Sequence, residues 1–188
     1  MNLSLLLATA LLVFHGDGLR MRAPAEVGMS PERLEYIDRI VRRGITAGGY
    51  PGAAIIVGRR GSVVFEQAYG KLSWGASSSP VSTDESIYDL ASLTKVVGTT
   101  TAAMVLFDEG KLELDAPVST YVPGFSGGLK DLVTVRMLLA HQSGLPAGRE
   151  LWRKRLTHDA ARQLVISTKL QYRPGTGTVY SDLGADML

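Results

Sequence analysis

The most constraining feature of the sequence is a pair of β-rich runs, at residues 53–57 and 63–65, that is followed by helical and loop patterns alone. The Gly-bounded segment 58–61 between them predicts the turn of a β-hairpin. A lone hairpin is marginally stable in water and leaves its strand edges unpaired. We therefore expect the hairpin to belong to a larger sheet, with further strands that this sequence does not supply.

Helical patterns account for most of the remaining chain. Ser30 is a good N-cap, Pro31 suits the first helical position, and apolar residues follow at spacings of three and four as far as Ile45. Later helices are predicted after Thr134 and near Thr157.

Another helix is predicted from Ser92 to Gly110. Its interior, VVGTTTAAMVLFDE, is rich in Thr and Ala and holds few charges. A helix without a broad polar face is usually buried, so we expect this one in the interior of the protein.

The composition fits one globular domain and excludes several functional classes. The chain has 188 residues, 45% of them hydrophobic, and a net charge of only +2. This charge, without a basic stripe, predicts no nucleic-acid binding. Cysteine is absent, which excludes disulfides and thiolate metal ligands, and the three histidines form no i, i+4 pair. We expect no metal site and no cofactor.

The N-terminus carries an apolar run, LSLLLATALLVF, at residues 3–14. The run is too short to span a bilayer and suits the core of a signal peptide. Residues 1–20 are therefore predicted to be a signal peptide or an N-terminal extension, and residues 21–188 an incomplete domain. No Lys or Arg precedes the run, so a buried N-terminal helix and a true start at Met21 are alternatives. The expected localisation is periplasmic or secreted, with a cytoplasmic one as the alternative.

Ser92-Leu93-Thr94-Lys95 is a Ser-x-x-Lys pattern at the start of a predicted helix. Residues three apart on a helix share a face, about 5–6 Å apart at Cβ, which places the ammonium beside the hydroxyl. Desolvation at a buried site would lower the lysine pKa, and a neutral Lys95 could then accept the proton of Ser92. The helix N-terminus would favour an oxyanion. Taken alone, the pattern is more often a surface helix start with a capping serine and a solvated lysine.

Tyr180-Ser181-Asp182 follows a Pro-Gly loop, with Tyr180 85 residues after Lys95. A nearby ammonium favours the phenolate, so Tyr180 could relay a proton beside Lys95. An isolated tyrosine is more often a core residue with a satisfied hydroxyl.

Three linked blocks together resemble one family, the class C beta-lactamase-like serine hydrolases. This family includes class C beta-lactamases, D-amino-acid carboxypeptidases and aminopeptidases, and beta-lactamase-fold esterases. IYDLASLTKVVGTTTAAMVLFDEGKLELDAPVSTYVPGF looks like its nucleophile helix and the segment that follows. VTVRMLLAHQSGLPA resembles the turn before its second motif, and YRPGTGTVYSDLG resembles the loop into its Tyr-x-Asn motif.

The resemblance covers roughly residues 28–188, and it implies a fold. The expected fold is α+β, of the α/β sandwich type and beta-lactamase/transpeptidase-like. It has an antiparallel sheet flanked by helices and a helical lobe, and here it is truncated after the second motif.

The resemblance also implies a role for each candidate residue. Ser92 would attack the carbonyl and form an acyl-enzyme, and its N–H would supply half of the oxyanion hole. Lys95 and Tyr180 would share the proton transfers. Asp182 would help to hold the substrate amide and the lysine.

The sequence departs from the family pattern in two ways. Asp182 stands where the family usually has Asn; an ionised Asp only accepts hydrogen bonds, and beside Lys95 it would raise the lysine pKa. The family's third motif, Lys or His followed by Thr or Ser and Gly, is not found. In the family, the strand that carries this motif also supplies the second N–H of the oxyanion hole. Loss of one oxyanion donor typically costs on the order of 10²–10³ in rate. His141 and Ser143 lie in a family-like turn and are predicted to be structural, because the resemblance gives them no catalytic role.

The resemblance therefore implies a serine hydrolase that acts through an acyl-enzyme on ester, D-amino-acid peptide or beta-lactam carbonyls. Asp182 favours esters and D-peptides over lactams. The expected partner is a small-molecule or peptide substrate, and the oligomeric state is left open. The alternative is a truncated, catalytically inactive fragment or pseudoenzyme. A structural domain with a chance motif is disfavoured by the linked blocks.

Overall fold

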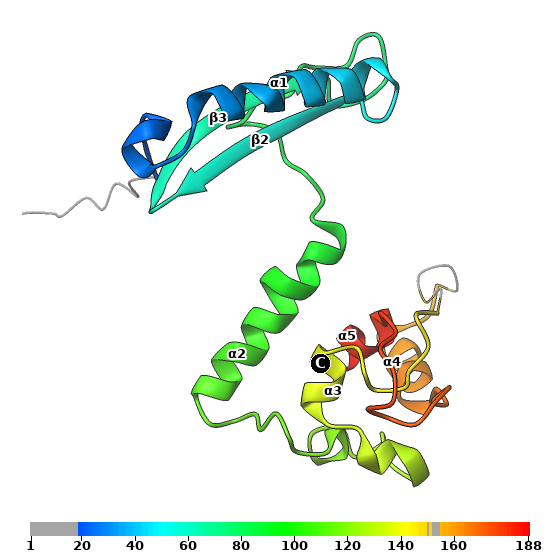
Figure 1. Ribbon diagram of the computed structural model, residues 1–188. Coiled ribbons are helices and arrows are strands. Elements are labelled where there is room, and N and C mark those ends of the chain that lie inside the picture. Colours follow the sequence, from blue (N-terminus) through cyan, green and yellow to red (C-terminus); the bar gives the residue numbers. More distant parts are fainter. Residues whose placement is uncertain (1–18, 150, 152–154) are drawn as a thin grey trace, which may run out of the picture. The chain divides into compact units, whose positions relative to one another are not determined.

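The computed structural model describes residues 19–149, 151 and 155–188, which belong to two compact units, Met1–Tyr88 and Asp89–Leu188. Figure 1 shows a small sheet with a long helix in the first unit, and helices joined by loops in the second. The apolar run at residues 3–14, the predicted signal-peptide core, lies outside the described residues.

The predicted hairpin is confirmed as strands β2 (Gly52–Arg59) and β3 (Ser62–Gly70), which pair antiparallel. Arg60 and Gly61 join them with φ angles of 51° and 71°, and two positive φ values are typical of a type I′ hairpin turn. A short strand that was not predicted, β1 (Arg20–Met21), pairs in parallel with β3. The described sheet has the order β1-β3-β2, and the two-residue strand β1 adds a parallel pairing to the predicted antiparallel hairpin.

Helix α1 (Pro31–Thr46) begins where the sequence predicts. The Ser30 side chain accepts the N–H of Arg33 at 3.2 Å, which confirms the N-cap. A 3₁₀ turn, η1 (Pro24–Val27), precedes the helix. The core of this unit consists of Val27, Leu34 and Val64, with Met29, Ile37, Val57 and Phe65 packed against them.

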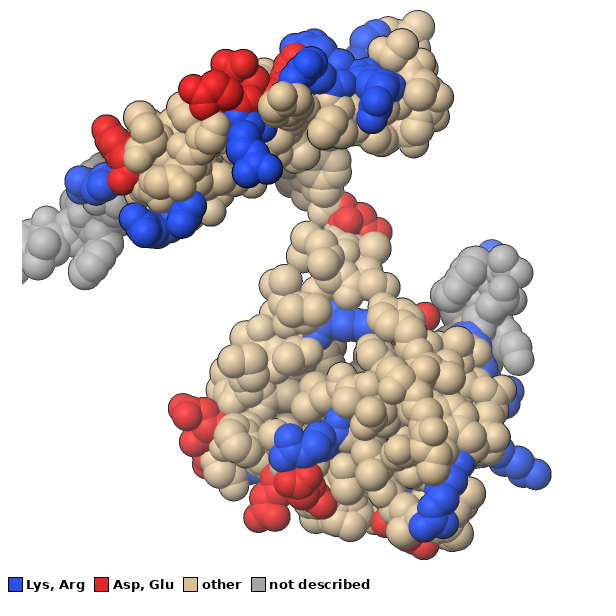
Figure 2. All heavy atoms as spheres, in the orientation of Figure 1, with Lys and Arg blue, Asp and Glu red and all other residues tan. Residues whose placement is uncertain are grey.

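The helix predicted from Ser92 is present, but it changes type along its length. A 3₁₀ turn, η2 (Ala91–Leu93), is followed by a π-helix, η3 (Lys95–Thr100), and then by helix α2 (Thr101–Asp108). The expectation that it is buried is wrong. Its exposed apolar side chains are Leu93, Val96, Val97, Met104, Val105, Leu106 and Phe107, and Figure 2 shows a mainly uncharged surface here. Burial requires a facing surface, which an apolar composition does not itself provide.

The rest of the second unit is built from short helices. They are η4 (Val118–Thr120), η5 (Gly128–Leu132), α3 (Val135–Leu139), α4 (His158–Ser167) and α5 (Asp182–Met187). Their core consists of Val118, Phe125, Val133, Leu138, Leu145, Val165, Ile166 and Leu183. Burial of one such side chain stabilises the fold by roughly 1.5–3 kcal/mol.

Three of these helices begin at polar N-caps. The side chains of Thr134, Thr157 and Ser181 each accept the N–H of the third residue after them, at 3.3, 3.3 and 3.1 Å. The first two starts are confirmed predictions. Helix α5 was not predicted, because its cap lies inside the Tyr-Ser-Asp motif.

Candidate active site

Ser92 lies in the 3₁₀ turn η2, directly after a strained residue. Ala91 has a φ of +44°, a conformation that costs residues other than glycine roughly 1–2 kcal/mol. The Asp89 carboxylate accepts the Ala91 N–H at 2.8 Å, which stabilises the bend. Backbone strain of this kind clusters at functional sites, and here it lies next to the candidate nucleophile.

Lys95 opens a π-helix rather than an α-helix. The Thr100 hydroxyl donates to the Lys95 carbonyl at 2.8 Å, and the Thr101 hydroxyl donates to the Val96 carbonyl at 3.2 Å. In both contacts the hydroxyl donates to a carbonyl five residues earlier in the chain, which is the spacing of a π-helical turn. Short π segments are frequent at functional sites. The threonine run at residues 99–101 is the sequence signal for this feature, although the run had been interpreted only as a sign of burial.

Tyr180 and Asp182 lie on either side of the N-cap of α5. Ser181, between them, is buried, and its hydroxyl donates to the Pro146 carbonyl at 2.7 Å. The Asp182 N–H donates to the Ala147 carbonyl, also at 2.7 Å. The motif is therefore fixed to the turn that follows α3, while the side chains of Tyr180 and Asp182 remain exposed.

The Lys95 ammonium brings the four predicted residues together. Its Nζ lies 3.3 Å from Ser92 Oγ and 2.7 Å from Asp182 Oδ1. The same atom lies 5.2 Å from the centroid of the Tyr180 ring. Two segments that are far apart in sequence thus meet at one cation within the second unit. The role of each residue remains a prediction.

The charge state expected for Lys95 has to be corrected. The sequence suggested that burial would lower its pKa. The ion pair with Asp182 and a hydrogen bond with Tyr180 instead raise the pKa of Lys95 above its ordinary value, against a smaller opposing effect of desolvation. Lys95 is therefore an ammonium at neutral pH, as the Asp182 departure from the family pattern indicated.

Tyr180 shows the opposite shift. Hydrogen bonds with Ser92 and Lys95 lower the pKa of Tyr180 below its ordinary value, and the charge of Lys95 adds to this effect. The environment therefore stabilises the phenolate relative to that of an ordinary tyrosine. Of the groups that contact the Ser92 hydroxyl, Tyr180 is the one whose proton-free form is stabilised.

Two cavities open onto Ser92 and Lys95. One, of about 410 Å³, has Asp182 in its wall. The other, of about 150 Å³, is lined in part by His141 and Tyr180. Solvent and small ligands can therefore approach the candidate nucleophile from the side of Asp182 and from the side of Tyr180.

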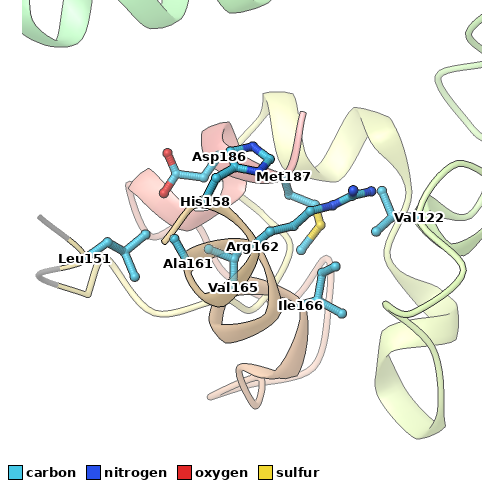
Figure 3. Close-up of a pocket in the computed structure, with 9 residues that line it drawn as sticks. All are labelled: Val122, Leu151, His158, Ala161, Arg162, Val165, Ile166, Asp186 and Met187. Atoms are coloured by element: carbon cyan, nitrogen blue, oxygen red, sulfur yellow. The ribbon is translucent and has the colours of Figure 1, made fainter. Parts of the chain in front are cut away.

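A neighbouring cavity of about 470 Å³ has no Ser92 in its wall (Figure 3). It shares Leu151 and Asp186 with the 410 Å³ cavity, so it adjoins the site without containing the reactive groups. Burial, together with the charge of Asp182, raises the pKa of Asp186. The other lining residues are Val122, His158, Ala161, Arg162, Val165, Ile166 and Met187.

The described residues contain no group of three or more His, Cys, Asp or Glu side chains that could hold a metal ion. No helix among them is both long and apolar enough to cross a membrane.

A family model described as Beta-lactamase matches residues 37–188. The chain belongs to the beta-lactamase family. The matched range contains Ser92, Lys95, Tyr180 and Asp182, and it includes parts of both compact units.

Two curated relatives are named as a carboxypeptidase and as an amidase. The chain is 31% identical to "Putative D-alanyl-D-alanine carboxypeptidase" of Escherichia coli (strain K12), over 86% of this chain and 41% of that protein. It is 33% identical to "N-acetylmuramyl-L-alanine amidase" of Bacillus subtilis (strain 168), over 85% of this chain and 40% of that protein. The chain spans about two fifths of the length of these relatives.

Solved structures confirm the predicted α+β, beta-lactamase/transpeptidase-like fold. A class C beta-lactamase in complex with cefoxitin matches with a TM-score of 0.70 and 25% identity, over 83% of this chain and 42% of that one. A penicillin-binding protein homologue from Caulobacter crescentus matches with a TM-score of 0.67 and 26% identity, over 85% and 43%.

The turn after α3 contains a ring contact with Tyr180 that was not predicted from the sequence. Ser143 is buried and its Oγ accepts the Leu145 N–H at 3.3 Å, a contact within the turn itself. His141, predicted to be structural as well, has its ring 4.6 Å from the ring of Tyr180. No signal in the sequence links the two rings, because the contact depends on two turns that meet in space.

Proposed function

We propose that this chain carries the nucleophile half of an acyl-serine hydrolase that acts on ester, D-amino-acid peptide or beta-lactam carbonyls. The observation that supports the proposal is the convergence of Ser92, Tyr180 and Asp182 on the Lys95 ammonium, at 3.3 Å, 5.2 Å and 2.7 Å. Family membership adds to this support, since relatives are named as a carboxypeptidase and an amidase.

In the proposed mechanism, Tyr180 is the base and Lys95 remains protonated. The Ser92 hydroxyl proton passes to the Tyr180 phenolate while Oγ bonds to the substrate carbonyl carbon. The proton then passes from Tyr180 to the leaving alkoxide or amine as the carbonyl–heteroatom bond breaks, which leaves an acyl-enzyme. Water attacks the acyl-enzyme by the same route, with its proton going to Tyr180 and then to Ser92.

Lys95 acts in this scheme through its charge. An ammonium beside the phenolate favours the ionised form of Tyr180, and the Asp182 carboxylate keeps the ammonium in place. Both effects agree with the directions of the pKa shifts of Lys95 and Tyr180. A neutral Lys95 would require loss of the contact with Asp182.

Asp182 also favours some substrates over others. A carboxylate accepts hydrogen bonds but cannot donate one to a substrate carbonyl, as an asparagine amide can. We therefore propose esters and D-amino-acid peptides ahead of lactams. If residues 1–20 act as a signal peptide, the site of action is periplasmic or extracellular, where peptide substrates of the cell wall occur.

The proposal is tested by covalent labelling of the 188-residue chain with a fluorophosphonate, and separately with a fluorescent penicillin, read by intact mass. Ser92→Ala removes the proposed nucleophile, and Ser167→Ala, at an exposed serine of α4, is the matched control. We expect one fluorophosphonate adduct that is lost in Ser92→Ala and kept in Ser167→Ala. A folded chain that forms no adduct contradicts the proposal and supports the inactive-fragment alternative.

A further inference from the structure

His141 occupies a backbone position that favours glycine. It follows the last residue of α3 by two positions and has a φ of +56°. The N–H groups of His141 and Gln142 donate to the carbonyls of Leu138 and Met137, at 3.1 and 2.7 Å. These two bonds form a Schellman C-cap in which His141 is the left-handed residue. Glycine is usual there because a Cβ is strained in that region, so the histidine side chain calls for an explanation of its own.

The imidazole contacts the segment that carries Tyr180. Its Nδ1 accepts the Ser181 N–H at 3.1 Å, so the ring proton of the neutral imidazole is on Nε2. Its ring centroid lies 4.6 Å from that of Tyr180, with the ring planes inclined by 39°. The His141 carbonyl accepts the Val179 N–H at 3.0 Å. Tyr180 and both of its neighbours in sequence are thus held by a single residue.

Tyr180 needs such support because its side chain is exposed. A hydroxyl in contact with Ser92 and Lys95 must keep its direction without walls of packed side chains around the ring. The described ring contacts of Tyr180 are those with His141 and Lys95. Lys95 is itself tied to Asp182, on the other side of Ser181.

We propose that His141 is a positioning residue, whose imidazole holds the Tyr180 ring and the Ser181 N–H so that the phenol points to Ser92 and Lys95. The proposal rests on the proposed function in one respect, since it takes Tyr180 as the base. Helix capping does not account for the histidine, because the cap uses only the backbone of His141, and glycine would serve there with less strain.

Four substitutions separate the parts of this role. His141→Gly and His141→Ala both remove the imidazole, but only glycine fits the left-handed backbone without strain. His141→Asn keeps an acceptor oxygen close to the position of Nδ1, and asparagine tolerates the left-handed region. His141→Phe keeps a ring and loses the acceptor.

The measurement is the ionisation of Tyr180 in the whole chain, labelled with ¹³Cζ-tyrosine and titrated by NMR. Tyr180→Phe assigns the signal, and a melting temperature is recorded for every variant. Lys95 and Asp182 are the charged groups that face Tyr180, and both are unchanged in the four His141 variants.

The proposal predicts that the pKa of Tyr180 rises toward the ordinary tyrosine value of about 10 by the same amount in His141→Gly and His141→Ala. We expect this although the glycine variant melts at a higher temperature than the alanine variant. His141→Asn should retain most of the parent behaviour, and His141→Phe should retain part of it. An unchanged Tyr180 pKa in His141→Gly overturns the proposal. A change confined to the less stable His141→Ala also overturns it, because a purely structural role would follow stability.

Labelling of Ser92 in the parent chain separates this proposal from the proposed function. A labelled parent whose Tyr180 is unaffected in His141→Gly contradicts the positioning role alone. An unlabelled parent whose Tyr180 responds to His141→Gly contradicts the hydrolase function and leaves the positioning role standing.

Discussion

The two halves of the candidate site are built in different ways. The half that carries Tyr180 and Asp182 rests on a packed core, in which Leu138, Leu145 and Leu183 are 2%, 0% and 0% exposed. Its motif is tied to the preceding turn by backbone and side-chain hydrogen bonds.

The half that carries Ser92, residues 89–108, has few buried apolar contacts. Ala103 is buried, whereas Met104 and Phe107 are more than half exposed. Its local shape depends on the Asp89 side-chain turn and on the threonine hydroxyls of the π-helix.

This contrast shows what holds each reactive group. Packing and hydrogen bonds fix the backbone segment that carries Tyr180, the proposed base, whereas the polar contacts of Lys95 connect the proposed nucleophile to that segment. Changes in the core should therefore unfold the Tyr180 half, and changes in charge should alter the site without unfolding the chain.

The largest effect is expected from Leu183→Ala. Leu183 is fully buried in the core of the second unit, and truncation of such a leucine costs about 2–5 kcal/mol. The matched change on the other half, Met104→Ala, affects a side chain that is 63% exposed, so we expect about 0.5 kcal/mol or less. Chemical denaturation of both variants measures the difference. Equal losses would show that the two halves are packed alike.

A smaller loss is expected from Ser181→Ala. Its hydroxyl caps α5 by accepting the Gly184 N–H and donates to the Pro146 carbonyl. Loss of an N-cap side chain costs about 0.5–2 kcal/mol. Ser167→Ala, at an exposed serine, should lose much less in the same denaturation experiment. If Ser181→Ala is as stable as the parent, the motif is not anchored by its cap.

Asp182→Asn is expected to change the charge of the site more than its stability. The carboxylate is the main cause of the raised pKa of Lys95, so this pKa should fall when the amide replaces it. The ion pair contributes stability below the ordinary lysine pKa of 10.5, and this contribution is lost as pH rises through the higher pKa of the folded protein.

Because Asp182 is exposed, the stability lost in Asp182→Asn at pH 7 should be about 1 kcal/mol or less. The amide can donate a hydrogen bond to a lactam carbonyl, and one such bond is worth about 0.5–1.5 kcal/mol, or roughly two- to tenfold in rate. Fluorescent-penicillin labelling of Asp182→Asn against Asp182→Ala measures this gain. If Asp182→Asn is labelled no faster than Asp182→Ala, this result would contradict the substrate preference proposed above.

The smallest effect is expected from Ala91→Gly. Glycine relieves the strained φ of +44° before Ser92. It also increases the conformational entropy of the unfolded chain, which lowers the free energy of unfolding by about 0.5–1 kcal/mol. The net change should be a stabilisation of about 1 kcal/mol or less. Ala102→Gly, inside helix α2, is the control and should be destabilised by about 1 kcal/mol. Thermal melts of both variants measure the difference.

Much of the fold could be predicted from local sequence patterns. Ser30 was predicted as an N-cap, a helix was predicted after Thr134, and the glycine-bounded turn predicted the hairpin. The linked motifs also predicted the family, which the family model confirms. These features follow from short-range chemistry that a single sequence contains.

The features that were predicted wrongly or missed are those that depend on contacts between residues far apart in the sequence. The apolar run of α2 was read as buried, although no facing surface could be inferred from its own residues. Burial alone predicted a lowered pKa for Lys95, whereas the Asp182 side chain, 87 positions later in the sequence, raises it, as the replacement of the family's Asn by Asp182 had indicated. The link between His141 and Tyr180 depends on two turns meeting in space, which spacing alone does not reveal.

The most direct test of the central claim, that Tyr180 rather than Lys95 takes the Ser92 proton, is the rate of fluorophosphonate labelling as a function of pH. Because the base must be deprotonated and its pKa is lowered, the rate in the parent chain should rise with pH through a pKa below the ordinary tyrosine value of about 10. In Tyr180→Phe this rise should disappear and the rate should fall by about 10²- to 10⁴-fold, the usual contribution of a positioned base. A Tyr180→Phe chain that labels at the parent rate with the parent pH profile would contradict the account.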